Sequence, residues 1–259
     1  MNQSMMPKTV LSAQDVYKSY GSKGSTQQVL KGVNLRVTKG EFVGIMGPSG
    51  SGKTTLLNVL ATIDRATDGV ILINDDDISK LKDKQIANIR RKHLGFIFQD
   101  YNLLDTLTVK ENILLPISLS HISASEAQRE FNDIANILGI TNVANKYPAE
   151  ISGGQKQRAS VARALIHKPS IVFADEPTGA LDSKTAAAML ENLNEINEKR
   201  GVSIVMVTHD PVASSYCSRV VFLKDGKVFS ELYRGNKTRV GFFKEIMDVQ
   251  AVLGGGSPE

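Results

Sequence analysis

The chain has 259 residues, 41% of them hydrophobic, and a formal net charge of +4. It has no apolar run near the roughly 18 residues of a membrane-spanning helix, and residues 1–8 lack the features of a signal peptide, so we expect a cytoplasmic protein unless a partner holds it at a membrane. The single cysteine, Cys217, excludes an intrachain disulfide framework and a cysteine-rich metal site, and the lack of a dense basic stripe gives no indication of nucleic-acid binding.

The first elements are predicted to be antiparallel strands. Val10 to Tyr20 and Val29 to Val37 alternate apolar and polar residues, and a polar, Gly/Ser-rich link joins them. Val70 to Ile73 has the composition of a further strand. Asp77, which follows a turn-forming acidic run, is predicted to cap a helix that reaches Lys92.

A glycine-rich loop lies between a predicted strand, Glu41 to Met46, and a predicted helix, Thr55 to Ala61. It has the pattern G-x-x-x-x-G-K-[ST], in which backbone N–H groups and a helix N-terminus surround a phosphate. The residues of this loop are Gly47, Pro48, Ser49, Gly50, Ser51, Gly52, Lys53 and Thr54. Lys53 is expected to reach the β- and γ-phosphates of a nucleotide and Thr54 to ligate Mg²⁺. We include Thr55, the next residue, among the nucleotide-binding positions.

Residues 100–167 have a helical pattern throughout. Ser123 and Glu126 have the spacing of a capping box, which predicts a helix start at this point. A second glycine-rich turn, formed by Ser152, Gly153, Gly154 and Gln155, precedes another predicted helix. It could present backbone amides to an anion, but it has no lysine of its own, so we do not expect it to hold a nucleotide unaided.

After residue 167, predicted strands and helices alternate again. The apolar strand Ile171 to Ala174 leads directly into Asp175 and Glu176, an arrangement that resembles a Walker B motif. Because neighbouring strand residues point to opposite faces, we expect Asp175 to serve a magnesium ion and Glu176 to polarise the attacking water.

The remaining predicted elements are a helix over 183–199, a strand over 203–208 and a hairpin around residues 225–226. The C-terminal tail places Phe242, Phe243, Ile246, Val249 and Leu253 on one helical face. This face could pack on the protein's own core or contact a partner, and the pattern leaves both interpretations open.

The segment from Ile151 to Arg158, ISGGQKQR, resembles the signature motif of ABC-transporter ATPases, with isoleucine where leucine is usual. The resemblance implies an α/β, P-loop NTPase core with an antiparallel β subdomain and a helical insertion. We expect an ABC ATPase domain over residues 8–235, with the helical subdomain at about 100–167, and an amphipathic tail over 236–259.

The same resemblance assigns roles to residues that have none when taken alone. Tyr20 matches the aromatic residue that stacks on adenine, and Gln99 matches a glutamine that touches Mg²⁺ and senses the transport partner. Asp182 belongs to a segment similar to the D-loop, and His209 matches the switch histidine that contacts the γ-phosphate. The implied ligands are ATP and Mg²⁺, with Thr54, Gln99 and Asp175 at the metal and Glu176, His209 and Gln99 in catalysis.

The family resemblance also implies a head-to-tail dimer, in which the signature turn of one chain closes over the ATP of the other. Residues 95–113 and 208–213 look like those of the bacitracin-type antimicrobial-peptide resistance transporters of Gram-positive bacteria. This implies a separate integral-membrane permease, in some systems linked to a sensor histidine kinase, with the chain at the cytoplasmic face of the membrane. The alternatives are an ATPase that drives cell-wall remodelling and an ATPase that drives lipoprotein or macrolide export. A soluble ABC protein of DNA repair or translation is disfavoured, because the chain has one ATPase domain and no zinc module or coiled coil.

Overall fold

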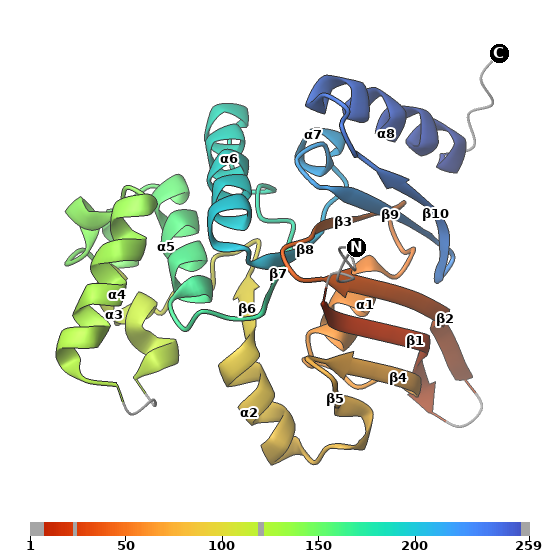
Figure 1. The fold of residues 1–259 in the computed structure, drawn as a ribbon, viewed down its shortest axis with the longest axis horizontal. Helices are drawn as coiled ribbons and strands as arrows, with labels where there is room; N and C mark the ends of the chain where they lie inside the picture. Colours follow the sequence, from red (N-terminus) through yellow and green to blue (C-terminus); the bar gives the residue numbers. More distant parts are fainter. Residues whose placement is uncertain (1–7, 23–24, 119–121, 255–259) are drawn as a thin grey trace, which may run out of the picture.

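The strands of the protein form two sheets, seen in a computed structural model that describes residues 8–22, 25–118 and 122–254 (Figure 1). The antiparallel sheet has the order β2–β1–β4–β5, with β1 (Thr9–Ser22), β2 (Ser25–Thr38), β4 (Asp68–Ile73) and β5 (Asp76–Asp77). The central sheet has the order β10–β9–β3–β8–β7–β6, with β3 (Phe42–Met46), β6 (Leu94–Ile97), β7 (Ile171–Asp175), β8 (Ser203–Val207), β9 (Arg219–Lys224) and β10 (Lys227–Tyr233). Its strands are parallel except for the edge strand β10.

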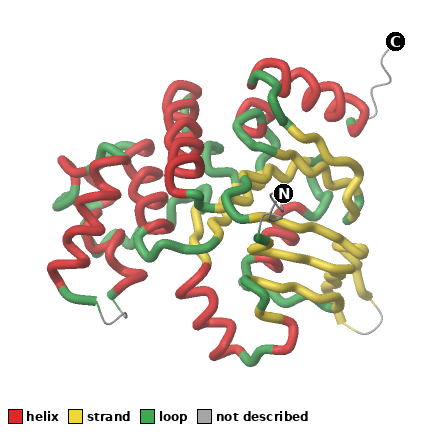
Figure 2. The backbone as a smooth tube through the Cα atoms, viewed as in Figure 1, coloured by secondary structure: helices red, strands yellow, loops and turns green. Residues whose placement is uncertain are grey.

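Eight α-helices lie in the described part of the chain. They are α1 (Lys53–Leu60), α2 (Asp83–His93), α3 (Val109–Leu114), α4 (Ala124–Ile137), α5 (Gly153–Leu165), α6 (Ser183–Arg200), α7 (Pro211–Ser214) and α8 (Arg239–Leu253). Short 3₁₀ turns occupy Ile78–Lys80, Leu115–Ile117, Thr141–Val143 and Pro148–Glu150. Figure 2 shows α3, α4 and α5 grouped on one side, away from the antiparallel sheet. No described helix is both long enough and apolar enough to cross a membrane.

The central sheet separates two hydrophobic cores, because successive side chains of a strand point to opposite faces. On β7, Ile171 and Phe173 belong to the core shared with α1 and the antiparallel sheet. Val172 and Ala174 belong to the core shared with the helical subdomain, α6 and α8. Both faces of the sheet are therefore covered, as expected for parallel strands, and the central strands are buried along their length.

The parallel arrangement also brings distant parts of the sequence together. Strands β3, β8, β7 and β6 are neighbours in that order. Their carboxyl ends lead into the phosphate loop, His209, Asp175–Glu176 and the segment with Gln99, respectively. One edge of the sheet therefore carries most of the residues that the sequence pattern singled out.

Most predicted elements are confirmed, with three differences. The helical pattern predicted over residues 100–167 begins only with α3, because residues 98–108 form an irregular segment. Strand β6 was not predicted, because its four residues stand next to a helical pattern and are too few to show a period of their own. Asp77 was expected to cap a helix reaching Lys92, but its side chain accepts a hydrogen bond from Ser79 N and caps only one 3₁₀ turn. The extended residues Leu81 and Lys82 then separate this turn from α2.

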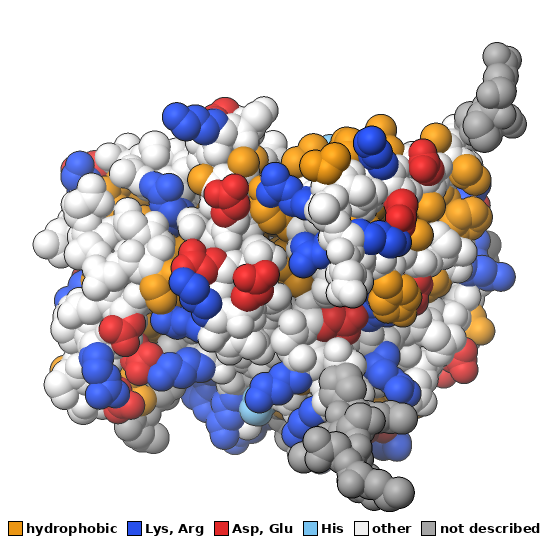
Figure 3. Space-filling view, turned by 45° about the horizontal axis from the view of Figure 1, so that its top comes forward, with side chains coloured by type: hydrophobic (Ala, Val, Ile, Leu, Met, Phe, Trp, Pro, Cys, Tyr) orange, Lys and Arg blue, Asp and Glu red, His pale blue; other side chains and the backbone are white. Residues whose placement is uncertain are grey.

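The tail helix α8 packs on the protein's own core, one of the two interpretations that the sequence left open. Phe242, Ile246 and Leu253 are buried in the core of the helical side. Val240, Met247 and Val252 remain exposed, and hydrophobic side chains are visible along the upper right of Figure 3, where α8 lies. Residues 1–7, on which the argument about a signal peptide rests, and residues 255–259 of the tail lie outside the described residues.

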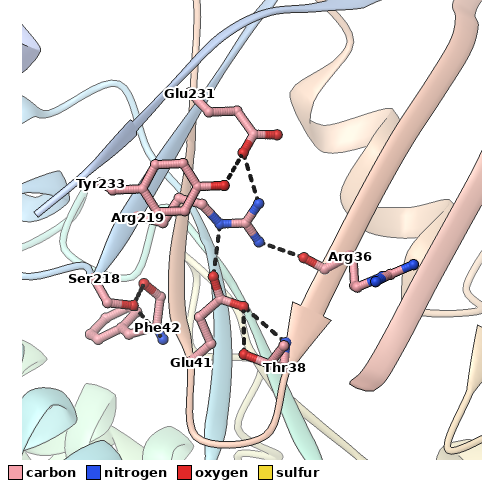
Figure 4. A network of polar contacts seen from close by, with 8 residues as sticks. All are labelled: Arg36, Thr38, Glu41, Phe42, Ser218, Arg219, Glu231 and Tyr233. Carbon is pink, nitrogen blue, oxygen red and sulfur yellow. Dashed lines mark hydrogen bonds and ion pairs between the residues drawn. The ribbon is translucent and has the colours of Figure 1, made fainter. Parts of the chain in front are cut away.

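A buried arginine, Arg219, joins the two sheets (Figure 4). Its side chain is 7% exposed, and its Nε and Nη1 donate to Glu41 at 2.7 Å and to Glu231 at 2.9 Å. Its Nη2 donates to the backbone oxygen of Arg36 on β2. Tyr233 OH donates to the same Glu231 oxygen at 2.8 Å. The network connects β9, β10, the start of β3 and the antiparallel sheet.

Replacing Arg219 with methionine should lower the free energy of unfolding by about 3 kcal/mol, because it leaves Glu41 and Glu231 partly buried without their cation. Urea denaturation followed by circular dichroism measures this. Arg36→Met is the matched control: only the backbone of Arg36 takes part in the network, so its effect should stay within about 0.5 kcal/mol. Equal effects of the two variants would contradict the stabilising role of the network.

Candidate active site

The phosphate loop follows β3 and ends at Gly52, which adopts a left-handed conformation immediately before α1. Gly47 has a φ of +153°, and a Cβ at this position would lie 2.1 Å from the carbonyl oxygen of Leu223, so only glycine fits. Lys53 Nζ donates to the carbonyl oxygens of Gly47 and Pro48, both at 2.9 Å. The lysine therefore extends along the loop, toward the place where the pattern puts a phosphate.

The loop opens onto a cleft of about 510 Å³. Its lining residues are Gln27, Val29, Ser49, Gly50, Gly52, Lys53, Thr54, Thr55, Glu176 and His209. All except Gln27 and Val29 were predicted from the sequence. These two belong to β2, which carries no motif, so only the fold could reveal their position beside the loop. The cleft brings phosphate-binding and catalytic candidates together within one chain.

Glu176 takes a backbone conformation that the sequence argument did not foresee. We expected Asp175 and Glu176 to differ because strand neighbours point to opposite faces, but β7 ends at Asp175 and Glu176 has a left-handed φ of +44°. Its backbone N–H donates to Val207 O on the neighbouring strand at 2.9 Å. A non-glycine residue held in this conformation is strained, and such strain is concentrated at functional sites.

The side chain of Glu176 contacts His209 directly. The Oε1 atom of Glu176 lies 2.8 Å from His209 Nδ1 and accepts a hydrogen bond from the His209 backbone N–H at 3.1 Å. The Glu176 side chain is 17% exposed, whereas that of His209 is 73% exposed. The carboxylate is thus held in a fixed orientation at the cleft by a residue from the next strand.

Electrostatic interactions connect the same groups. Burial lowers the pKa of Lys53, and the negative charges of Glu176 and Asp175 partly oppose this effect. Burial raises the pKa of Asp175, the charge of Glu176 raises it further, and Lys53 opposes the rise. The ionised form of Asp175 is therefore disfavoured unless a further cation is bound beside it.

The residues at this edge fit a magnesium ion. The Oδ1 atom of Asp175 is buried and has no hydrogen-bond partner in the described part of the chain, and Thr54, on the neighbouring loop, supplies a hydroxyl oxygen. Among the described residues, no group of three or more His, Cys, Asp or Glu side chains is arranged to hold a metal ion. Mg²⁺ commonly uses one or two protein oxygens together with water and substrate phosphates, so this donor set suits it.

Six predicted residues of this site lie outside the lining of the cleft: Tyr20, Gly47, Pro48, Ser51, Gln99 and Asp175. Tyr20 OH donates to Asp64 at 2.8 Å, and Lys18 Nζ lies 4.6 Å from the centroid of its ring. The Gln99 amide lies against Gly179, where an added Cβ would be 3.2 Å from Gln99 Nε2. Ser51 is buried within the loop, and its Oγ has no partner.

The second glycine-rich turn lines a separate hollow of about 320 Å³. Ser152 caps α5, and Gln155 donates its backbone N–H to Ser152 Oγ at 3.3 Å and accepts from Ser152 N at 2.9 Å. Asp182 caps α6 and is bonded to Thr185 Oγ1 at 2.6 Å. The hollow is lined by Ser152, Gly153, Gly154, Arg158, Ala180, Leu181, Asp182 and Thr185. Arg158 and Thr185 were not predicted to line it, although Arg158 lies in the quoted motif.

The two glycine-rich turns thus belong to different hollows of one chain. The cleft has the lysine, the carboxylate and the histidine. The second hollow has a helix N-terminus and the guanidinium of Arg158, whose buried Nε has no partner among the described residues. Within one chain, therefore, the signature-like turn does not line the cleft that holds Lys53.

The profile of the ABC transporter family matches residues 30–179. The chain is 61% identical to the bacitracin export ATP-binding protein BceA of Halalkalibacterium halodurans, over 95% of this chain and 97% of that protein. It is 39% identical to the lipoprotein-releasing system ATP-binding protein LolD of Geobacter metallireducens, over 86% of this chain and 99% of that protein.

Solved structures agree with the sequence comparison. The ATP-binding cassette MJ0796, in a dimeric post-hydrolysis state bound to ADP and Pi, superimposes with a TM-score of 0.79 at 39% identity, covering 86% of this chain and 98% of the other. The chain belongs to the ABC transporter family and is an ATPase of that family.

Replacing Asp175 with asparagine should have opposite effects on stability and turnover. The raised pKa means that stability falls as the pH rises from about 3.8 through the folded-state value, so at pH 7 the carboxylate destabilises the nucleotide-free fold. The melting temperature of the nucleotide-free variant should rise by about 1–3 °C.

Magnesium-dependent ATP hydrolysis by the same variant should fall by about 100-fold or more, because the variant loses the carboxylate expected to serve the ion. The exposed Asp105 provides a matched control, and Asp105→Asn should change neither property. A lower melting temperature for Asp175→Asn would contradict the unfavourable burial of this carboxylate.

Proposed function

We propose that the site residues act as the family resemblance implies. Lys53 and the loop amides bind the β- and γ-phosphates of ATP, and Tyr20 stacks on the adenine ring. Glu176 polarises the attacking water and His209 contacts the γ-phosphate. The observation that carries this proposal is the cleft in which Lys53, Thr54, Glu176 and His209 converge, because phosphoryl transfer depends on positioning and charge compensation.

Thr54, Asp175 and Gln99 are the proposed residues for Mg²⁺. When bound, the ion neutralises charge on the phosphates and orients them for in-line attack. The unpartnered Asp175 oxygen supports this assignment. Gln99 lies against Gly179, which lies within the segment that joins Glu176 to Asp182. A movement of this segment would therefore reach Gln99.

We infer a head-to-tail dimer as the active form. The Ser152–Gln155 turn and Asp182 of one chain would contact the ATP held by the loop of the other. The separation of the two hollows within one chain supports this arrangement, and the similar cassette MJ0796 is a dimer. Such an interface is isologous and places two nucleotides between the subunits.

The proposed physiological role is to power a separate permease that handles bacitracin-like antimicrobial peptides. The support is the match to a bacitracin export ATP-binding protein over nearly the full length of both chains. The chain would then act at the cytoplasmic face of the membrane, held there by the permease, and the permease could in turn contact a sensor histidine kinase.

A second candidate role is to drive a permease for lipoprotein or macrolide export or for cell-wall remodelling. The lipoprotein-releasing relative favours it at 39% identity. The 61% identity to the bacitracin export protein favours the first role, since the shared ATPase motifs do not distinguish the two.

Glu176→Gln should retain ATP binding, lose nearly all turnover and accumulate the ATP-bound dimer. The amide keeps the size of the side chain but cannot polarise water, and we expect at least about a 100-fold decrease in kcat. Steady-state phosphate release and size-exclusion chromatography with ATP test this. The exposed Glu191 on α6 is a suitable control, as Glu191→Gln should behave like the unmodified chain. Undiminished hydrolysis by Glu176→Gln would contradict its role as general base.

The transport role is tested by purification from native membranes in mild detergent, followed by mass spectrometry of the proteins that remain bound. Co-purification of a permease with ten membrane helices and a large extracellular domain is the expected result. A four-helix permease with cell-wall hydrolase regulators would instead support the remodelling role.

A further inference from the structure

The segment that follows Gln99 has an unusual backbone. Tyr101 and Asn102 are consecutive non-glycine residues with φ values of +62° and +48°, both in the left-handed region. This region is costly for residues with a Cβ, and most of all for a large side chain such as tyrosine. Two such residues in succession persist only where the surrounding structure holds them in place.

Arg163 on α5 supplies that support. Its Nη2 donates to Tyr101 O at 2.8 Å and its Nη1 to Asn102 O at 2.5 Å. Burial lowers the pKa of its guanidinium, and among the described residues Arg163 forms no ion pair. The two carbonyl oxygens therefore serve as its polar partners, and the planar fork of an arginine can reach both at once.

Tyr101 also contacts the start of the same helix. Its hydroxyl oxygen is 3.1 Å from the position that a Cβ on Gly153 would occupy. Gly153 and Arg163 are ten residues apart, about 15 Å along α5. Tyr101 is thus hydrogen-bonded to one end of α5 through its backbone and lies against the other end through its hydroxyl group.

The far end of the segment is held by a third residue. Asn112 on α3 is fully buried. Its Nδ2 donates to Leu104 O, Leu107 O and Thr108 O at 3.0 Å each, and its Oδ1 accepts from Leu104 N at 2.7 Å. The irregular segment between β6 and α3 is therefore hydrogen-bonded to the helical subdomain at both ends.

We propose that Arg163 is a positioning residue for ATP hydrolysis: by holding Tyr101 and Asn102 in the left-handed conformation, it fixes Gln99 relative to the Ser152–Gln155 turn. This inference rests on the proposed roles of Gln99 and of that turn. Arg163 itself contacts neither the cleft nor the second hollow. Its effect on turnover is therefore indirect and acts through the backbone of two residues.

The test compares Arg163→Lys with Arg129→Lys, an exposed arginine on α4, in the full-length protein. A lysine keeps the charge but cannot bridge two carbonyl oxygens. We expect kcat to fall by about tenfold, with the KM for ATP changed by less than about twofold, because small displacements near reacting groups impair turnover more than binding. Arg129→Lys should match the unmodified chain, and the melting temperature of Arg163→Lys should stay within about 2 °C of it.

A rescue experiment separates positioning from general stability. Glycine adopts the left-handed conformation without strain. The double variant Arg163→Lys with Asn102→Gly should therefore have a kcat about threefold or more above that of Arg163→Lys alone. Tyr101→Phe, which removes only the hydroxyl at Gly153, should lower kcat by about threefold and provides a second variant if Arg163→Lys does not fold.

Normal kcat in both Arg163→Lys and Tyr101→Phe would overturn the proposal, as would a loss of kcat that follows the melting temperature and is not rescued by Asn102→Gly. If Glu176→Gln retains full hydrolysis while Arg163→Lys behaves as expected, the proposed catalytic assignment fails and the positioning effect stands. If Glu176→Gln loses hydrolysis while Arg163→Lys keeps a normal kcat, the catalytic assignment stands and only the positioning role of Arg163 is refuted.

Discussion

The register of the parallel central sheet is the constraint on which the rest of the structure depends. The hydrogen bonds that align β3 with β8 and β8 with β7 place the ends of these strands side by side. The phosphate loop, His209 and the Asp175–Glu176 pair follow those ends. Each of these strands packs against a core on both faces, so a shift of one residue would move every side chain into the opposite core and disrupt the packing of both. The two cores thereby fix the position of the site.

The site is organised in advance of substrate binding. The backbone of Glu176 is bonded to Val207, its carboxylate is bonded to His209, and Lys53 is extended along the carbonyl groups of its own loop. Asp175 keeps a buried oxygen without a partner. These features cost stability in the nucleotide-free chain, and a bound cation and phosphates would remove much of that cost.

The helical subdomain carries the second glycine-rich turn, which is supported in a different way. Its glycine-rich turn is formed by helix capping, and the segment after Gln99 is held by side chains from α3 and α5. In the proposed function, these hydrogen bonds would transmit movement of this segment to the Ser152–Gln155 turn and so couple a membrane partner to hydrolysis.

The sequence by itself determined the elements and motifs whose chemistry is local. The phosphate loop, the helix cap at Ser123 and the hairpin at residues 225–226 depend on neighbouring residues, so the local sequence is enough to predict them. Only the tertiary structure decided that Gln27 and Val29 line the cleft, that Glu176 is left-handed, that Arg163 holds Tyr101 and Asn102, and that α8 packs on the core. Each of these depends on contacts between segments distant in the chain, and such contacts are set by sheet register and packing, which leave no periodic signal in the residues involved.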